Sequence, residues 1–318
     1  MKMYSVVLML LLCAGTSIAQ DKPGILVLAH GGSGIWERMV TAAVAPLKQK
    51  YPTEIAFGMA DPKTVQKGLN NLEKEGIRSV IVVPLFISSH SPIIRQTEYL
   101  LGLREDLPDE PLVMNHAPNP LSLVTAQSFR RQHSHGSDDA NKERDQVVIK
   151  PIASQARIMM TKPLDDDSLV ASILYERILG VSQPDESETV ILVAHGPNDE
   201  EDNKGWLEKL TSLAGQIQSK RLAEKGRGFK SIECTTVRDD AEESVYDEAK
   251  MKLRDMVKSA GSTSRVIVVP VVLALGGIEA GIRRRLEGLE YVWVKKALLP
   301  HENVTRFIEV SVTKVLAE

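Results

Sequence analysis

The feature that most limits the fold of this chain is a set of apolar runs that occurs twice. Residues 25–29 and 190–194 are continuous apolar runs, and each is followed directly by His-Gly. Residues 79–84 and 265–270 form a second pair, rich in β-branched side chains and ending in proline. Such runs are typical of strands that helices bury on both faces, as in parallel sheets. The chain therefore contains one supersecondary unit twice.

The remaining segments of each half follow in matching order. We expect further strands at 54–60, 156–164, 231–237 and 291–300, and helices at 62–76, 166–179, 241–259 and 301–315. Strands that alternate with helices predict an α/β protein in which each half has a four-stranded parallel sheet with right-handed crossovers and helices on both faces.

The boundaries follow from composition. We expect a first α/β domain at 20–181, a polar linker at 182–188 and a second domain at 189–318. A polar insert at about 107–155 interrupts the first domain. In an alternative register, residues 111–116 form the fourth strand and 120–131 its helix; we prefer 156–164, which closely precedes the next repeat.

The N-terminus has the pattern of a secretory signal peptide at residues 1–19. A basic start at Lys2 precedes a short apolar run, and Ser17 and Ala19 are small residues suited to cleavage before Gln20. The run is short for an uncleaved membrane anchor. We expect an exported, periplasmic protein with no membrane span after cleavage; without a working signal the protein would be cytoplasmic.

Composition excludes several classes of function. The net charge of −3 and the aromatic content of 4% give no basis for binding nucleic acid. Of the two cysteines, Cys13 lies in the signal and only Cys234 remains after cleavage. An intramolecular disulfide and a cysteine-based metal site are therefore excluded, so metal chemistry must use histidine, carboxylate or backbone oxygen.

Two histidines of the first half are the strongest candidates for chemistry. His30 ends the first strand, and His90 lies just past the third strand. The carboxyl ends of parallel strands meet at one edge of the sheet, so both imidazoles can reach one crevice. Such a pair suits a divalent ion such as Co²⁺, Fe²⁺, Ni²⁺ or Zn²⁺, and it suits proton transfer near neutral pH. The alternative is that each histidine caps a helix or fills a loop.

These elements together resemble the class II chelatases, and more narrowly the sirohydrochlorin chelatases of the CbiX type. The resemblance rests on the run ending in His30-Gly31, the run ending at Pro84 and followed by His90, and the closing strand–helix units, over about residues 24–316. It implies two Rossmann-like halves facing each other across a tetrapyrrole cleft. It also implies a lyase, a cobaltochelatase or ferrochelatase, that acts without an organic cofactor and has His30 and His90 as its metal ligands.

The implied reaction inserts Co²⁺, or alternatively Fe²⁺ or Ni²⁺, into sirohydrochlorin during cobalamin or siroheme biosynthesis. The divalent metal and the tetrapyrrole are then substrates, and the protein acts as a monomer with two pseudo-symmetric halves. Two imidazoles, with water completing the shell, hold an ion loosely enough to release it, and one of them can accept a pyrrole proton. Backbone N–H groups near Gly31, Gly32 and Ser33 could receive the macrocycle's carboxylates.

The second half departs from this pattern. His195 is retained, but the position of His90 falls on Gly276, because both lie six residues after the corresponding prolines at 84 and 270. We expect the second half to close the cleft, with His195 or Glu279 as auxiliary contacts.

Other polar groups have two interpretations each. His133 and His135 in the insert could collect metal, but a solvated loop is favoured. The acidic run at 199–202 could bind cations or be solvated, and the arginines at 283–285 could meet carboxylates or form an outer helix face. Trp36 and Trp206 lie at equivalent helix starts, so we expect them to serve in packing rather than to contact the macrocycle. We expect His116 and His301 to lie at a helix start or in a loop.

Two further hypotheses compete with the enzyme. The signal peptide and the degenerate second half also suit an exported, non-catalytic carrier of metal or tetrapyrrole. A phosphate-binding loop at 31–34 is weaker, because the lysine of a Walker loop and the full dinucleotide fingerprint are absent.

Overall fold

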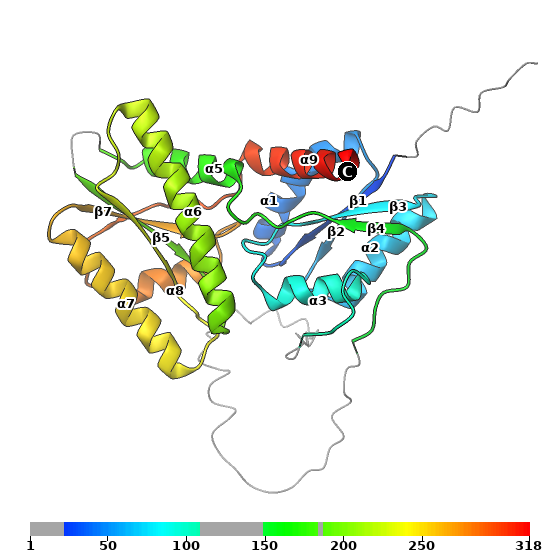
Figure 1. Ribbon diagram of the computed structural model, residues 1–318, viewed down its shortest axis with the longest axis horizontal. Coiled ribbons are helices and arrows are strands. Elements are labelled where there is room, and N and C mark those ends of the chain that lie inside the picture. Colours follow the sequence, from blue (N-terminus) through cyan, green and yellow to red (C-terminus); the bar gives the residue numbers. More distant parts are fainter. Residues whose placement is uncertain (1–21, 109–148, 184–186) are drawn as a thin grey trace, which may run out of the picture.

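The computed structural model describes residues 22–108, 149–183 and 187–318, which form two α/β halves side by side (Figure 1). The predicted signal peptide, most of the insert and His116, His133 and His135 lie outside these residues. So does the alternative fourth strand at 111–116.

The first half is a four-stranded parallel sheet in the order β2-β1-β3-β4. Its strands are β1 (Gly24–Ala29), β2 (Thr53–Phe57), β3 (Ser79–Pro84) and β4 (Arg157–Met160). Its helices in chain order are α1 (Gly34–Val44), the 3₁₀ helix η1 (Ala45–Gln49), α2 (Pro62–Lys74) and α3 (Pro92–Leu100). The placement of β4 beside β3 confirms the preferred fourth strand.

The second half repeats this sheet in the order β6-β5-β7-β8. Its strands are β5 (Glu188–Ala194), β6 (Ser231–Thr236), β7 (Arg265–Val271) and β8 (Val292–Trp293). Its helices are α6 (Glu200–Lys225), α7 (Glu243–Gly261) and α8 (Gly277–Arg285). All pairings are parallel, so the predicted fold class is confirmed. The expected strand at 291–300 is much shorter than predicted, because the chain leaves the sheet after Trp293.

Burial explains why these runs form central strands. All six residues of β1 and all seven of β5 are buried, with alternate side chains entering the cores on opposite faces of each sheet. Leu26 and Leu28 contact α2, for example, while Ile25 and Val27 lie in a core that extends into the second half.

The last helix of each half covers the other half's sheet. Helix α5 (Ser168–Leu179) contacts α6 and β7, whereas α9 (Glu302–Ala317) contacts α1 and β3. Figure 1 shows α5 beside α6 and α9 above α1. One continuous core cluster therefore includes residues of both sheets, such as Val83 and Val269. This exchange ties the two halves together and was not predicted from the sequence.

The described residues contain no helix long and apolar enough to cross a membrane.

Candidate functional site

The topology places the two predicted histidines on neighbouring strands. Strand β1 pairs with β3 in the register Leu28 to Pro84, and the loops that contain His30 and His90 follow these strands at the carboxyl edge. Because β2 lies on one side of β1 and β3 on the other, the connections diverge here. Open α/β sheets bind ligands at such a switch point.

The His30 imidazole is exposed, and its own loop fixes its tautomer. Its Nδ1 lies 2.9 Å from the carbonyl oxygen of Gly31. A carbonyl can only accept, so Nδ1 carries the proton in this contact. The neutral ring then presents the lone pair of Nε2, which is the form that binds a metal or accepts a proton.

The loop after His30 contains the three predicted contacts for substrate carboxylates. Gly31 has φ +83°, a backbone conformation suited to glycine. The Gly32 N–H donates to Glu37 Oε1 over 3.4 Å, and the Ser33 Oγ accepts from Trp36 N at 3.3 Å as the N-cap of α1. The Gly32 amide thus already meets a carboxylate oxygen, while the Ser33 hydroxyl is engaged in capping. Binding of substrate carboxylates here stays a prediction.

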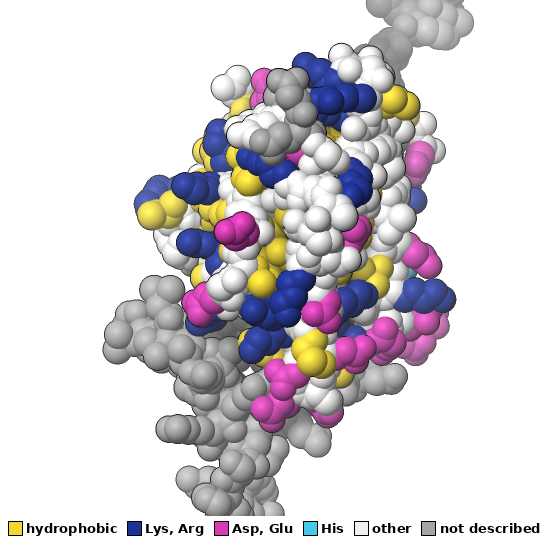
Figure 2. Space-filling view, turned by 90° about the vertical axis from the view of Figure 1, so that its left-hand side faces the viewer, with side chains coloured by type: hydrophobic (Ala, Val, Ile, Leu, Met, Phe, Trp, Pro, Cys, Tyr) yellow, Lys and Arg dark blue, Asp and Glu magenta, His cyan; other side chains and the backbone are white. Residues whose placement is uncertain are grey.

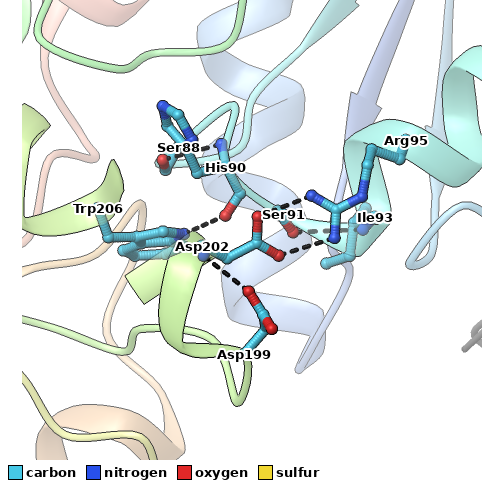
Figure 3. A network of polar contacts seen from close by, with 8 residues as sticks. All are labelled: Ser88, His90, Ser91, Ile93, Arg95, Asp199, Asp202 and Trp206. Carbon is cyan, nitrogen blue, oxygen red and sulfur yellow. Dashed lines mark hydrogen bonds and ion pairs between the residues drawn. The ribbon is translucent and has the colours of Figure 1, made fainter. Parts of the chain in front are cut away.

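The His90 loop is held from three directions. The Ser88 Oγ accepts from His90 N at 3.2 Å, and Asp165, just beyond β4, accepts from Ser89 N at 2.7 Å. From the second half, the indole Nε1 of Trp206 donates to His90 O over 2.6 Å (Figure 3). The backbone position of His90 therefore depends on both halves of the protein.

A partly buried ion pair joins α6 to α3, the helix that follows the His90 loop. Arg95 on α3 donates from both terminal nitrogens to Asp202 on α6, each over 2.7 Å (Figure 3). Asp202 is 7% exposed, and its backbone N–H donates to the N-cap Asp199 at 2.8 Å. A bidentate guanidinium–carboxylate contact fixes orientation as well as distance. It locks the start of α6 against the first turn of α3, directly after His90.

The His90 ring itself lies against the backbone of α6. A Cβ atom added at Gly205 would fall 2.7 Å from His90 Cδ2 and closer still to other ring atoms. Only glycine permits this approach, because ordinary carbon contacts need roughly 3.5–4.0 Å. Gly205 and Trp206 are neighbours in the chain, so one turn of α6 supports both the ring and the carbonyl of His90.

The corresponding histidine of the second half, His195, lies beside a carboxylate. Its Nε2 is 3.2 Å from Asp240 Oδ2. The imidazole of His195 at this distance holds the pKa of Asp240 below its ordinary value, and the positive charge of a protonated His30 lowers it further. The two repeat histidines, one from each half, thus act on the same carboxylate.

The other predicted contacts of the second half have structural roles. Gly276 is the N-cap of α8, and its N–H donates to Glu279 Oε2 at 2.6 Å. His301 caps α9 by accepting from Asn303 N at 3.1 Å, as expected for a helix start. Burial raises the pKa of the Cys234 thiol to about 12, so this cysteine is protonated at neutral pH.

Among the described residues, no group of three or more His, Cys, Asp or Glu side chains is arranged as a preformed metal site. A site based on His30 and His90 would take its remaining ligands from water or substrate, and its metal ligation stays a prediction.

Sequence reasoning missed Asp240, Arg95 and Gly205, and it placed Asp202 in an acidic run that binds cations or is solvated, whereas Asp202 is buried and paired with Arg95. Asp240 has a counterpart in the first half, Asp61. The strand registers make Phe57 and Thr236 equivalent, and Asp61 and Asp240 each lie four residues after them. Asp61 caps α2, whereas Asp240 faces His195. The other three residues act between the halves, so no comparison of the repeats could reveal them.

Comparison with known proteins supports the chelatase assignment. The CbiX family model matches residues 24–117, which include β1 to α3 and both His30 and His90. No curated protein sequence matches the chain significantly.

Solved structures extend the likeness in fold to both halves. The structure titled SirB from Bacillus subtilis with Fe3+ superposes with a TM-score of 0.57 and 18% identity, covering 92% of this chain and 95% of that one. A multi-domain protein from Deinococcus radiodurans, whose title notes structural similarity to chelatases, gives a TM-score of 0.50 and 13% identity over 91% of this chain and 54% of that one. This chain has a chelatase-like α/β fold, and its residues 24–117 match the CbiX family model.

Proposed function

We propose that the protein inserts a divalent metal ion into a sirohydrochlorin-type tetrapyrrole, with Co²⁺ as the first candidate and Fe²⁺ or Ni²⁺ as alternatives. The observation that carries the proposal is the placement of His30 and His90 after neighbouring strands at the switch point of the first sheet. The match of this segment to the CbiX family supports it.

His30 is the group best prepared for exchange of protons or metal. Its ring is exposed, and the contact between Nδ1 and Gly31 O leaves Nε2 with a lone pair. Metal insertion needs two pyrrole N–H protons to leave while the ion passes from the protein to the macrocycle. An exposed neutral imidazole can accept a proton or hold the ion weakly, and both tasks require Nε2.

His90 differs from His30 because its surroundings are rigid. Its amide, its carbonyl and its ring each contact a fixed group, namely Ser88, Trp206 and Gly205. We assign His90 to positioning the metal, since a ligand held by both halves keeps its geometry while the ion is transferred. The two imidazoles leave most of the coordination shell to water, and an ion with exchangeable ligands can move on to the substrate.

The second half contributes charge and closure in this proposal. Asp240 stays ionised at neutral pH beside His195, because its pKa lies below the ordinary value. A carboxylate between the two loops would attract a dication and could receive protons released from the macrocycle. Asp240 and His195 are therefore auxiliary groups on the facing side of a tetrapyrrole cleft. Glu279 is less suited to such an auxiliary role, because its carboxylate already accepts the Gly276 N–H at the start of α8.

The second candidate is a carrier that binds metal or tetrapyrrole without turnover. The replacement of His90 by Gly276 in the second half favours it, and so does the predicted signal peptide at residues 1–19, which would export the protein to the periplasm. Both candidates use the same pair of histidines, so binding alone does not separate them.

Turnover separates the two candidates. Purified protein is mixed with an excess of sirohydrochlorin and Co²⁺, and the absorbance change of the macrocycle is followed against a protein-free control. An enzyme converts many equivalents of sirohydrochlorin per protein, at a rate proportional to protein concentration. A carrier gives a change that stops at one equivalent, and that outcome would reject the enzymatic proposal.

A further inference from the structure

A pocket of about 510 Å³ opens on the second half, between α8 and the edge strand β8. None of His30, His90 and His195 lines it. Its lining residues are Leu275, Glu279, Arg283, Tyr291, Trp293 and Lys295.

The repeat explains why this pocket is open. The registers of β3 with β4 and of β7 with β8 make Tyr291 and Trp293 the counterparts of Ile158 and Met160. In the first half, the chain that leads into β4 runs beside the same core as these positions. Ile152, Ile158 and Met160 all pack against that core, and Ile152 N–H donates to Leu100 O at 2.7 Å. In the second half, residues 286–291 alone join α8 to β8, so among the described residues this connection has no segment that corresponds to the chain before β4.

The two aromatic residues of the lining pack against the core of the second half. The rings of Tyr291 and Trp293 meet edge to face, with centroids 6.5 Å apart and planes at 86°, and both residues are partly exposed. Tyr291 and Trp293 thus place two aromatic rings in this pocket, where the first half has Ile158 and Met160. Pockets for small molecules combine such apolar walls with a few polar groups that fix orientation.

Two cations complete the lining. Arg283 and Lys295 are exposed, and within the described part of the chain neither makes an ion pair. By contrast, the neighbouring Arg285 is buried and paired with Asp239. The one carboxylate of the pocket, Glu279, accepts the Gly276 N–H. Figure 2 views the molecule from the side of the second half, where hydrophobic side chains are exposed among Lys and Arg side chains.

We propose that this pocket binds a flat aromatic molecule that bears a carboxylate. The rings of Tyr291 and Trp293 would contact its face or edge, and Arg283 and Lys295 would pair with the carboxylate. This site is separate from the histidines of the proposed chelatase, and it does not depend on metal insertion.

The test uses naphthalene-2-carboxylate as the probe and the full-length protein. Trp293 lines the pocket, whereas Trp36 and Trp206 do not, so quenching of tryptophan fluorescence that disappears in Trp293→Phe reports binding at this site. Arg283→Gln and Lys295→Gln should each weaken binding by at least about threefold, in line with the loss of one exposed charge pair. Arg284→Gln and Lys296→Gln are matched controls, because both are exposed neighbours outside the lining, and they should bind the probe like the unaltered protein.

A second probe, naphthalene-2-carboxamide, has the same ring system without charge and requires no variant. It should bind at least about threefold more weakly than the carboxylate. Equal affinity for the two probes would overturn the proposal, as would quenching that persists in Trp293→Phe or equal losses in the control variants. Metal insertion by Trp293→Phe should be unchanged, so failure here is distinguishable from failure of the proposed chelatase.

Discussion

Replacing glycine by alanine should have opposite effects on stability at two positions of the same helix. Gly205 and Gly215 both lie inside α6, where replacing glycine by alanine normally stabilises a helix by about 1 kcal/mol. Gly215 is exposed, and a Cβ atom added there would have no neighbouring atom within 4 Å, so Gly215→Ala should show this full gain. At Gly205 the new methyl group would overlap the His90 ring near its attachment to the backbone.

The overlap reverses the sign at Gly205. Forcing a methyl group into a packed contact costs about 1–3 kcal/mol, which offsets or exceeds the gain in helix propensity. We therefore expect the free energies of unfolding of Gly205→Ala and Gly215→Ala to differ by about 1–3 kcal/mol, measured from urea midpoints at constant m-value. His90→Ala removes the ring, so Gly205→Ala in that background should become stabilising by about 1 kcal/mol.

The reasoning fails if Gly205→Ala stabilises the protein as much as Gly215→Ala does. It also fails if Gly205→Ala remains equally harmful after the ring of His90 is removed, because the cost would then lie elsewhere in α6. A clear rescue would establish in solution that α6 lies directly against His90.

Three other changes test the contacts around His90 and His195. Trp206→Phe keeps an aromatic ring but loses the N–H that donates to His90 O. It should lower the free energy of unfolding by about 1 kcal/mol and weaken Co²⁺ binding. Unchanged Co²⁺ binding would mean that the His90 loop keeps its conformation without Trp206. Asp202→Asn removes the charge that meets Arg95, at a cost of about 1–3 kcal/mol in urea unfolding, whereas the exposed control Glu201→Gln should cost almost nothing. Asp240→Asn should destabilise at neutral pH but not in strong acid. Because the pKa of Asp240 is lowered in the folded protein, its contribution to the free energy of unfolding is complete above the ordinary carboxyl pKa of about 3.9. This contribution is lost as the pH falls through the pKa of the folded protein. A loss of stability in Asp240→Asn that does not depend on pH would contradict the contact with His195.

The central strands β1, β3, β5 and β7 were predictable because they are buried almost throughout. The run at 79–84 became β3 with the same bounds, and 190–194 lies within β5. Continuous burial on both faces demands a continuous apolar run, which a single sequence displays directly. The short β8 was overestimated, since residues 294 and 297–299 are buried although they lie outside the sheet.

The placement of His30 and His90 after neighbouring strands was also predictable, because parallel strands share one carboxyl edge. The exchange of α5 and α9 was not. An amphipathic helix shows that it has a buried face, but not which of two similar sheets buries it. The contacts of Arg95 with Asp202 and of Trp206 with His90 depend on that arrangement, with more than 100 residues between the partners in each pair.

The central claim is that His30 and His90 together perform metal insertion, and the initial rate of Co²⁺ insertion into sirohydrochlorin tests it most directly. His30→Ala and His90→Ala should each reduce this rate toward that of the protein-free reaction, while His301→Asn, which alters a helix cap far along the chain, should leave it nearly unchanged. Rates in His30→Ala and His90→Ala equal to that of the unaltered protein would contradict the account.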